Sequence, residues 1–133
     1  VDDLRGIGIS RGKSQYILNF NEAICSKVIV LDDMKNLGDA DVAEKLTCVK
    51  GIGSWTAKMY LLFVLERENI LPYEDGAFLQ AYRWLYQTQK AKPEDIMRKC
   101  RKWSPYSSIA SRYLYRALDR GYTKKPFAQY SVL

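Results

Sequence analysis

Two glycines flank one isoleucine at Gly51, Ile52 and Gly53, between two segments of helical pattern, and this arrangement suits the binding of a phosphate. Glycine permits a tight reversal of the chain and leaves backbone amides uncovered. Ser54 is predicted to cap the helix that follows, whose free N-terminal amides and positive dipole end attract an anion. Taken alone, the pattern also fits a plain helix end followed by a helix start, with no nucleic acid involved.

A carboxylate at Asp75 is the second candidate for chemistry. Pro72 ends the preceding helical pattern, and Asp75 stands directly before the next one, so it is predicted to be an N-cap. Its neighbour Glu74 is expected to be solvated. An N-cap can also take part in a reaction, because one side chain can serve both purposes.

The elements that must position these residues all follow a helical pattern. No segment alternates in the way a strand does, so the predicted class is all-α, a multi-helix bundle. Residues 1–9 are expected to be a loop, and residues 122–133 show no periodicity. Asp39 or Asp41 is expected to cap the helix before the glycine turn. The predicted helices cover residues 12–26 (with Ser10 as N-cap), 55–67, 92–102 and 104–121, and two further helices follow the caps at Asp39 or Asp41 and at Asp75.

Composition limits the class of protein. The length of 133 residues and the 47% hydrophobic content predict one domain over residues 1–133 with a substantial core. The formal charge of +6 favours a polyanionic partner. No apolar run reaches the roughly 18 residues that a membrane span needs, and no signal peptide opens the chain.

The cysteines exclude the usual metal centres. Cys25, Cys48 and Cys100 form no CxxC pair, and the chain has no histidine. This excludes the usual zinc sites and a four-cysteine iron–sulfur cluster. The three residues are expected to be reduced core thiols, as in a cytosolic protein.

Three stretches resemble one family. Residues 46–57, LTCVKGIGSWTA, closely resemble the hairpin of the helix-hairpin-helix (HhH-GPD) base-excision DNA glycosylases, and within them the 3-methyladenine DNA glycosylase II branch. Residues 8–17 resemble the helix that precedes this hairpin, and residues 103–118, WSPYSSIASRYLYRAL, resemble the last core helix. The resemblance begins partway through the family's domain, so the chain looks like its C-terminal portion, without the upstream helices.

The resemblance implies a catalytic role for Asp75, because the family carries an aspartate a few residues beyond a proline at the mouth of the base pocket. A carboxylate there stabilises positive charge on the sugar and orients the attacking water, with no cofactor required. Trp55 stands where bifunctional relatives have a lysine nucleophile, which implies a monofunctional enzyme without lyase activity. The implied base pocket consists of Trp55, Met59, Trp103 and Tyr106.

The resemblance also implies how DNA is held. Two departures from the family are Lys50, in place of the usual proline, and Met59, which leaves the lesion preference open. A structural Na⁺ or K⁺ ion is implied at the carbonyls of Val49 and Ile52. The expected partner is duplex DNA containing a damaged base, bound by a monomer in the cytoplasm at the bacterial nucleoid or in a nucleus. The implied phosphate-binding residues are Lys50, Gly51, Ile52, Gly53, Ser54 and Thr56.

The leading hypothesis is therefore a DNA glycosylase that hydrolyses the N-glycosidic bond of an alkylated purine flipped out of duplex DNA. An oxidised purine is an alternative substrate within the same family. From other classes, the alternatives are a non-catalytic helix-hairpin-helix DNA-binding module and a helical protein-interaction domain. The Pro72 to Asp75 loop argues against a pure binding module, since a carboxylate facing DNA phosphates does not help binding.

Overall fold

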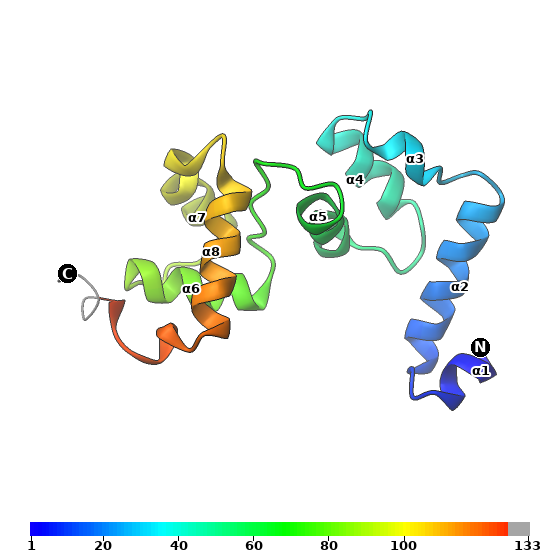
Figure 1. Ribbon diagram of the computed structural model, residues 1–133, viewed down its shortest axis with the longest axis horizontal. Helices are drawn as coiled ribbons and strands as arrows, with labels where there is room; N and C mark the ends of the chain where they lie inside the picture. The colour runs from blue at the N-terminus through cyan, green and yellow to red at the C-terminus, as the bar shows by residue number, and fades with distance from the viewer. Residues whose placement is uncertain (128–133) are drawn as a thin grey trace. The chain divides into compact units, whose positions relative to one another are not determined.

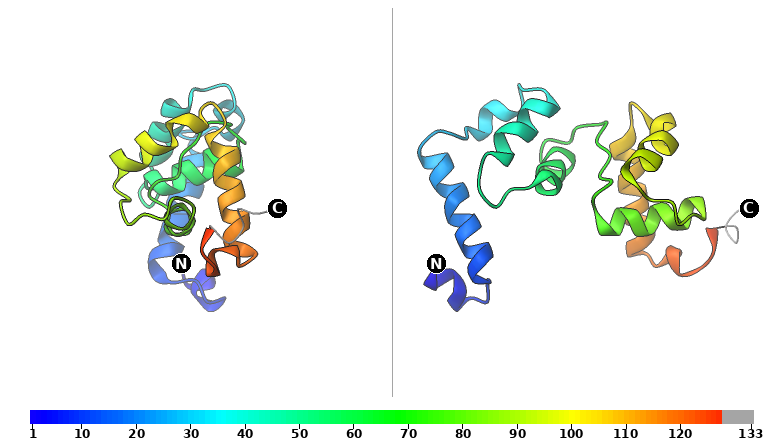
Figure 2. Two further views of the ribbon diagram at one scale, coloured as in Figure 1. Left: turned by 90° about the vertical axis from the view of Figure 1, so that its left-hand side faces the viewer. Right: turned by 180° about the vertical axis from the view of Figure 1, so that it is seen from behind.

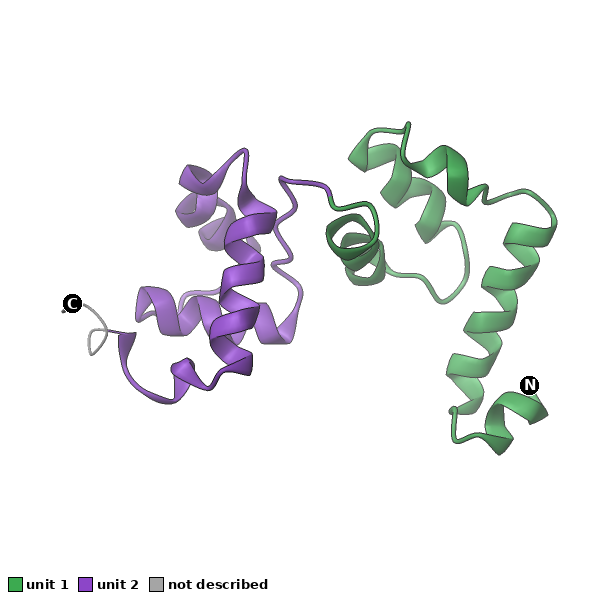
Figure 3. Cartoon of the chain, in the orientation of Figure 1, with its two compact units in different colours: residues 1–66 green, residues 67–133 purple. Residues whose placement is uncertain are grey.

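The computed structural model describes residues 1–127, and every regular element in that range is a helix. This confirms the predicted all-α class. The chain forms two compact units, residues 1–66 and 67–133, which Figure 3 colours separately. The single domain expected over residues 1–133 stays a prediction.

Unit 1 contains the first five helices. These are α1 (Asp2–Gly6), α2 (Arg11–Cys25), α3 (Leu31–Met34), α4 (Asp39–Thr47) and α5 (Ser54–Phe63), labelled in Figure 1. Helices α4 and α5 pack against each other as a pair. Val42 and Leu46 are four residues apart on one face of α4 and are buried, and Val49 follows them into the core. The buried apolar residues of the unit are Ala23, Ile29, Met34, Val42, Leu46, Val49, Ala57, Leu61 and Leu62.

Helix α2 begins as predicted, since the Ser10 hydroxyl accepts a hydrogen bond from the Lys13 amide. Its apolar face is only partly covered. Ala23 is buried, whereas Tyr16 and Ile17 are each 46% exposed. These two residues line a shallow apolar groove together with Ile52 of the glycine turn.

Unit 2 contains α6 (Gly76–Tyr86), α7 (Pro93–Cys100) and α8 (Ser107–Asp119), with short 3₁₀ turns η1 (Arg101–Trp103) and η2 (Tyr122–Lys124). Helix α8 crosses α6 at close range in Figure 1 and in the reverse view of Figure 2. Asp75 caps α6, as predicted. The core between these helices contains Phe78, Ala81, Tyr82, Ile96, Cys100 and Leu114.

Several predicted boundaries are wrong. Residues 2–6 form a short helix where a loop was expected, and α5 ends at Phe63 rather than near residue 67. Phe63 is exposed, although the sequence of α5 is apolar almost all round. Helix α8 begins at Ser107, three residues after the expected start. Of the tail expected to lack periodicity, residues 122–124 form a 3₁₀ turn and residues 128–133 lie outside the described range.

Two predicted caps are also wrong. The N-caps of α4 and α5 are Gly38 and Gly53, so Asp39 and Ser54 are the first helical residues instead. Asp41 lies further inside α4. A polar residue next to a glycine fits either position, and in both helices the glycine takes the extended cap conformation. The first turn of α5 consequently has no side-chain cap.

The cysteines divide between the units. All three are free thiols, but only Cys100 of unit 2 is buried, so the expectation of core thiols is wrong for Cys25 and Cys48. Among the described residues, no helix is long and apolar enough to cross a membrane, and no group of three or more metal-binding side chains gathers.

Stability is expected to fall in alkali because of Cys100. Burial raises the pKa of its thiol from 9.0 to about 12, although the Lys102 and Lys99 amines oppose the change. Above pH 9 the unfolded chain loses this proton while the folded chain keeps it. The free energy of unfolding should therefore decrease as the pH rises from 9 towards 12, by at most about 1.4 kcal/mol per pH unit from this group.

Urea unfolding at pH 8 to 10 measures this effect, and the tyrosines, whose ordinary pKa is 10.0, contribute equally in the unaltered protein and the variants. Cys100→Ala should show a flatter pH dependence than the unaltered protein, even though the small cavity lowers its stability at every pH. Cys48→Ala is the control and should keep the original slope. Equal slopes in all three proteins would contradict the assignment.

Candidate functional site

The glycine turn joins α4 and α5 into a helix-hairpin-helix. The Val49 amide donates to the Leu46 carbonyl at 3.1 Å, and the Ile52 amide donates to the Val49 carbonyl at 3.0 Å. Gly51 has φ = +106°, a conformation that residues with a Cβ rarely adopt. A Cβ at Gly51 would also overlap the Tyr16 side chain of α2, so the turn fits closely against that helix.

The hairpin leaves backbone donors open at the start of α5. Gly51, Gly53 and Thr56 are exposed, and their amides donate to no group among residues 1–127. The Lys50 carbonyl is held by the Asn19 side-chain amide at 2.9 Å, which fixes the turn to α2. The result is a helix N-terminus with accessible amides beside the exposed Lys50, an arrangement that attracts an anion.

Two of the four predicted base-pocket residues lie on α5. Trp55 and Met59 are four residues apart and therefore share one face of the helix, with Trp55 48% exposed and Met59 half-buried. The other two belong to unit 2 and differ from each other. Trp103 packs edge-on against Phe78 at 6.4 Å between ring centroids, whereas Tyr106 is exposed. Membership of a base pocket stays a prediction for all four.

Asp75 is fixed by backbone and side-chain hydrogen bonds. Its amide donates to the Pro72 carbonyl at 3.0 Å, closing the turn, and its Oδ2 accepts from the Phe78 amide at 2.9 Å. Pro72 is fully buried and anchors this loop. Asp75 itself is only half-buried, while Glu74 is exposed, as expected. One carboxylate is thus held rigidly at the positive end of α6 with part of its surface accessible.

A tyrosine that the sequence did not single out lies beside this carboxylate. Tyr115 of α8 has a buried hydroxyl. Burial raises the pKa of Tyr115 well above its ordinary range, and the negative charge of the nearby Asp75 raises it further. The tyrosine therefore stays neutral next to the carboxylate. Forty residues separate the two in the chain, so no local pattern indicated that they meet.

The loop that leads to Asp75 is held by the start of α8. The Ile70 amide donates to Ser108 Oγ at 2.8 Å, and the Ser108 amide donates to the Glu68 carbonyl at 2.9 Å. Ser107 Oγ donates to Asn69 Oδ1 at 2.7 Å. Ser107 and Ser108 of the WSPYSS stretch therefore position the loop, a role that no local sequence pattern indicated.

Ser108→Ala is expected to destabilise unit 2, because it leaves the amide of buried Ile70 without an acceptor. A buried donor without a partner costs about 1–3 kcal/mol. Urea unfolding should show this loss. Ser104→Ala is the matched control, since Ser104 is exposed and its bond to Asn69 lies at the surface. A loss for Ser108→Ala no larger than for Ser104→Ala would contradict the role given to Ser108.

No family model matches the chain. The individual proteins and solved structures that it resembles include DNA-3-methyladenine glycosylases. DNA-3-methyladenine glycosylase 1 of Schizosaccharomyces pombe is 28% identical over 92% of the chain, which corresponds to 55% of that protein. The chain thus spans about half the length of the curated relatives it matches.

Two solved structures resemble the fold. A crystal structure of DNA-3-methyladenine glycosidase from Bacillus halodurans is 32% identical with a TM-score of 0.74, covering 87% of this chain and 54% of that one. The Schizosaccharomyces pombe 3-methyladenine DNA glycosylase Mag1, in complex with abasic DNA, is 29% identical with a TM-score of 0.78, covering 86% and 56%. The chain is therefore homologous to DNA-3-methyladenine glycosylases over about half of their length, and it has their all-α helix-hairpin-helix fold.

Proposed function

We propose that the protein acts in base-excision repair as a monofunctional DNA glycosylase that hydrolyses the N-glycosidic bond of an alkylated purine in duplex DNA. The observation that carries this proposal is Asp75, a half-buried carboxylate locked at the start of α6. Homology to DNA-3-methyladenine glycosylases supports it. So does the open N-terminus of α5 at the hairpin.

Asp75 supplies the chemistry. As the base leaves, the sugar gains oxocarbenium character, and a fixed carboxylate stabilises that charge more than it stabilises the ground state. The same group orients or deprotonates the attacking water. Asp75 Oδ2 already accepts a hydrogen bond from the Phe78 amide, so the carboxylate needs little reorganisation during the reaction.

Trp55 accounts for the absence of lyase activity in this proposal. An indole cannot form the imine through which bifunctional relatives cleave the strand. Trp55 is half-exposed at the start of α5 and offers its ring for stacking on a flipped base. Methylation of a purine ring nitrogen gives a cationic base, which an aromatic face attracts.

The hairpin holds the DNA backbone. Exposed amides of Gly51, Gly53 and Thr56 donate to a phosphate, so binding is independent of sequence and weakens with salt. The carbonyl oxygens of Val49 and Ile52 are ligands of the kind that an Na⁺ or K⁺ ion prefers. The Ile52 carbonyl accepts no hydrogen bond among residues 1–127, and that of Val49 accepts one and keeps a lone pair. Such an ion would add positive charge beside the phosphate.

Base release from methylated duplex DNA tests the proposal, with strand cleavage scored separately. The expected result is release of 3-methyladenine or 7-methylguanine from intact strands by a monomeric protein. Release of an oxidised purine instead would change the substrate class. Binding without release of any base would leave a non-catalytic DNA-binding module, and no binding would overturn the proposal. A repair function implies that the protein meets chromosomal DNA, in the bacterial nucleoid or a nucleus.

A further inference from the structure

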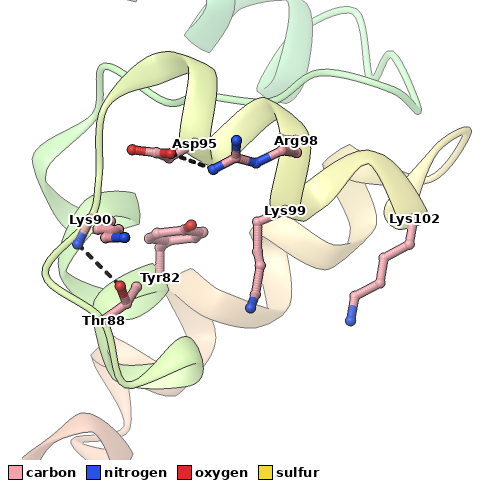
Figure 4. Close-up of a pocket in the computed structure, with 7 residues that line it drawn as sticks. All are labelled: Tyr82, Thr88, Lys90, Asp95, Arg98, Lys99 and Lys102. Carbon is pink, nitrogen blue, oxygen red and sulfur yellow. Dashed lines mark hydrogen bonds and ion pairs between the residues drawn. The ribbon is translucent and has the colours of Figure 1, made fainter.

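A basic hollow of about 380 Å³ lies on unit 2, where its lining residues come from α6, α7, η1 and the loop between α6 and α7. Figure 4 shows Tyr82 at its centre, with Thr88 and Lys90 on one side and Lys99 and Lys102 on the other. Asp95 and Arg98 complete the lining. This volume falls within the range of about 300–1,000 Å³ that ligand sites occupy, but the charged lining excludes an apolar ligand.

The lining offers donors and almost no acceptors. Asp95 is the one carboxylate, and it is engaged by Arg98 at 2.6 Å. The Thr88 hydroxyl accepts from the Lys90 amide at 3.1 Å and keeps its own proton to donate. Tyr82 is only 2% exposed, and its hydroxyl makes no hydrogen bond with any residue between 1 and 127. Burial raises the pKa of Tyr82, so this hydroxyl stays a donor.

The ammonium groups of the hollow have no carboxylate partner in the described part of the chain. Lys99 Nζ lies 4.9 Å and Lys102 Nζ 5.6 Å from the centroid of the Tyr86 ring, so two positive charges lie near one aromatic ring. Two positive charges near one ring repel each other, and a bound anion reduces that repulsion. Basic residues are also distributed unevenly along the chain, because six of the 21 fall within residues 90–102.

We propose that this hollow binds a phosphate of the DNA backbone, giving unit 2 a nucleic-acid contact of its own in addition to the hairpin of unit 1. Three lysines act as point charges, and the Tyr82 and Thr88 hydroxyls donate to phosphate oxygens. The inference rests on the proposed function in taking duplex DNA as the ligand. It requires no base contact, so the contribution is independent of sequence.

Lysine footprinting locates the contact directly. The protein is acetylated with and without an undamaged duplex at low salt, and modification of each lysine is measured by mass spectrometry. Lys90, Lys99 and Lys102 should become several-fold less reactive with DNA, and so should Lys50 of the hairpin. Protection of Lys50 alone would contradict phosphate binding in the hollow and support phosphate binding at the hairpin. If no lysine is protected, both the phosphate site in the hollow and the proposed binding of DNA are contradicted.

A charge-matched pair of variants supplies the second measurement. Lys99→Gln/Lys102→Gln should weaken binding of the same duplex about tenfold and reduce the slope of log affinity against log salt by roughly 1–2. The control is Arg116→Gln/Arg120→Gln, which removes the same charge from exposed positions at the end of α8. An equal loss in the two double variants would show a general charge effect and overturn the proposal.

Discussion

Asp75→Asn is expected to slow base release by roughly 10²–10³ while leaving the fold and duplex binding intact. Asparagine caps a helix about as well as aspartate, so the bond to the Phe78 amide survives and stability should change by less than about 0.5 kcal/mol. What disappears is the negative charge that stabilises the oxocarbenium-like sugar. Loss of a preorganised electrostatic contact of this kind lowers kcat by roughly 10²–10³.

Single-turnover base release, thermal unfolding and duplex binding are the three measurements for this variant. Glu74→Gln is the matched control, because it removes the adjacent exposed carboxylate and should retain normal release. If Asp75→Asn releases base at the normal rate, the carboxylate is only a helix cap. A variant that loses release together with its thermal transition would instead assign Asp75 a purely structural role.

Gly51→Ala is expected to cause the largest loss of stability in unit 1. The positive φ of Gly51 strains any residue with a Cβ, at a cost of about 1–3 kcal/mol. The new methyl group would overlap the base of the Tyr16 side chain, where a turn of the ring alone gives no relief. Crowding of this kind adds about 1–3 kcal/mol. The hairpin amides should also shift, so duplex affinity should fall.

Gly53→Ala separates this effect from the general cost of replacing glycine. Gly53 has φ = −95°, and a Cβ there meets nothing within 4 Å. Its loss should stay within about 1 kcal/mol, the difference between glycine and alanine as N-caps. Tyr16→Ala combined with Gly51→Ala should recover only the part of the crowding that comes from the ring, because the Cβ of residue 16 remains 2.6 Å from the added methyl group, and it should retain the φ strain. Urea unfolding that ranks Gly53→Ala as equally damaging would contradict this account of the turn.

Features determined by a few neighbouring residues could be predicted from the sequence. Ser10 and Asp75 are caps because their oxygens suit the amides three residues on, and both assignments are confirmed. The inward face of α4 follows from periodicity alone. Where two adjacent residues both suit a cap, as at Gly53 and Ser54, the local pattern does not choose between them.

Features that depend on distant residues could not be predicted in this way. Periodicity identified the apolar face of α2 but not that Tyr16 would remain half-exposed. The meeting of Tyr115 with Asp75 and the use of Ser108 to hold Ile70 both depend on how α8 packs. The catalytic role of Asp75 stays a prediction, because its cap explains the position without requiring chemistry.

Because one of the three thiols is buried and two are exposed, thiol reactivity can measure how often the core of unit 2 opens. Cys25 and Cys48 are exposed in unit 1, whereas Cys100 is buried in unit 2. A thiol reagent added to the folded protein should modify the first two quickly and the third only when the core around α7 opens. The slow phase therefore times the opening of unit 2 under native conditions, without any label or substitution. DNA that slows this phase would be stabilising unit 2 itself.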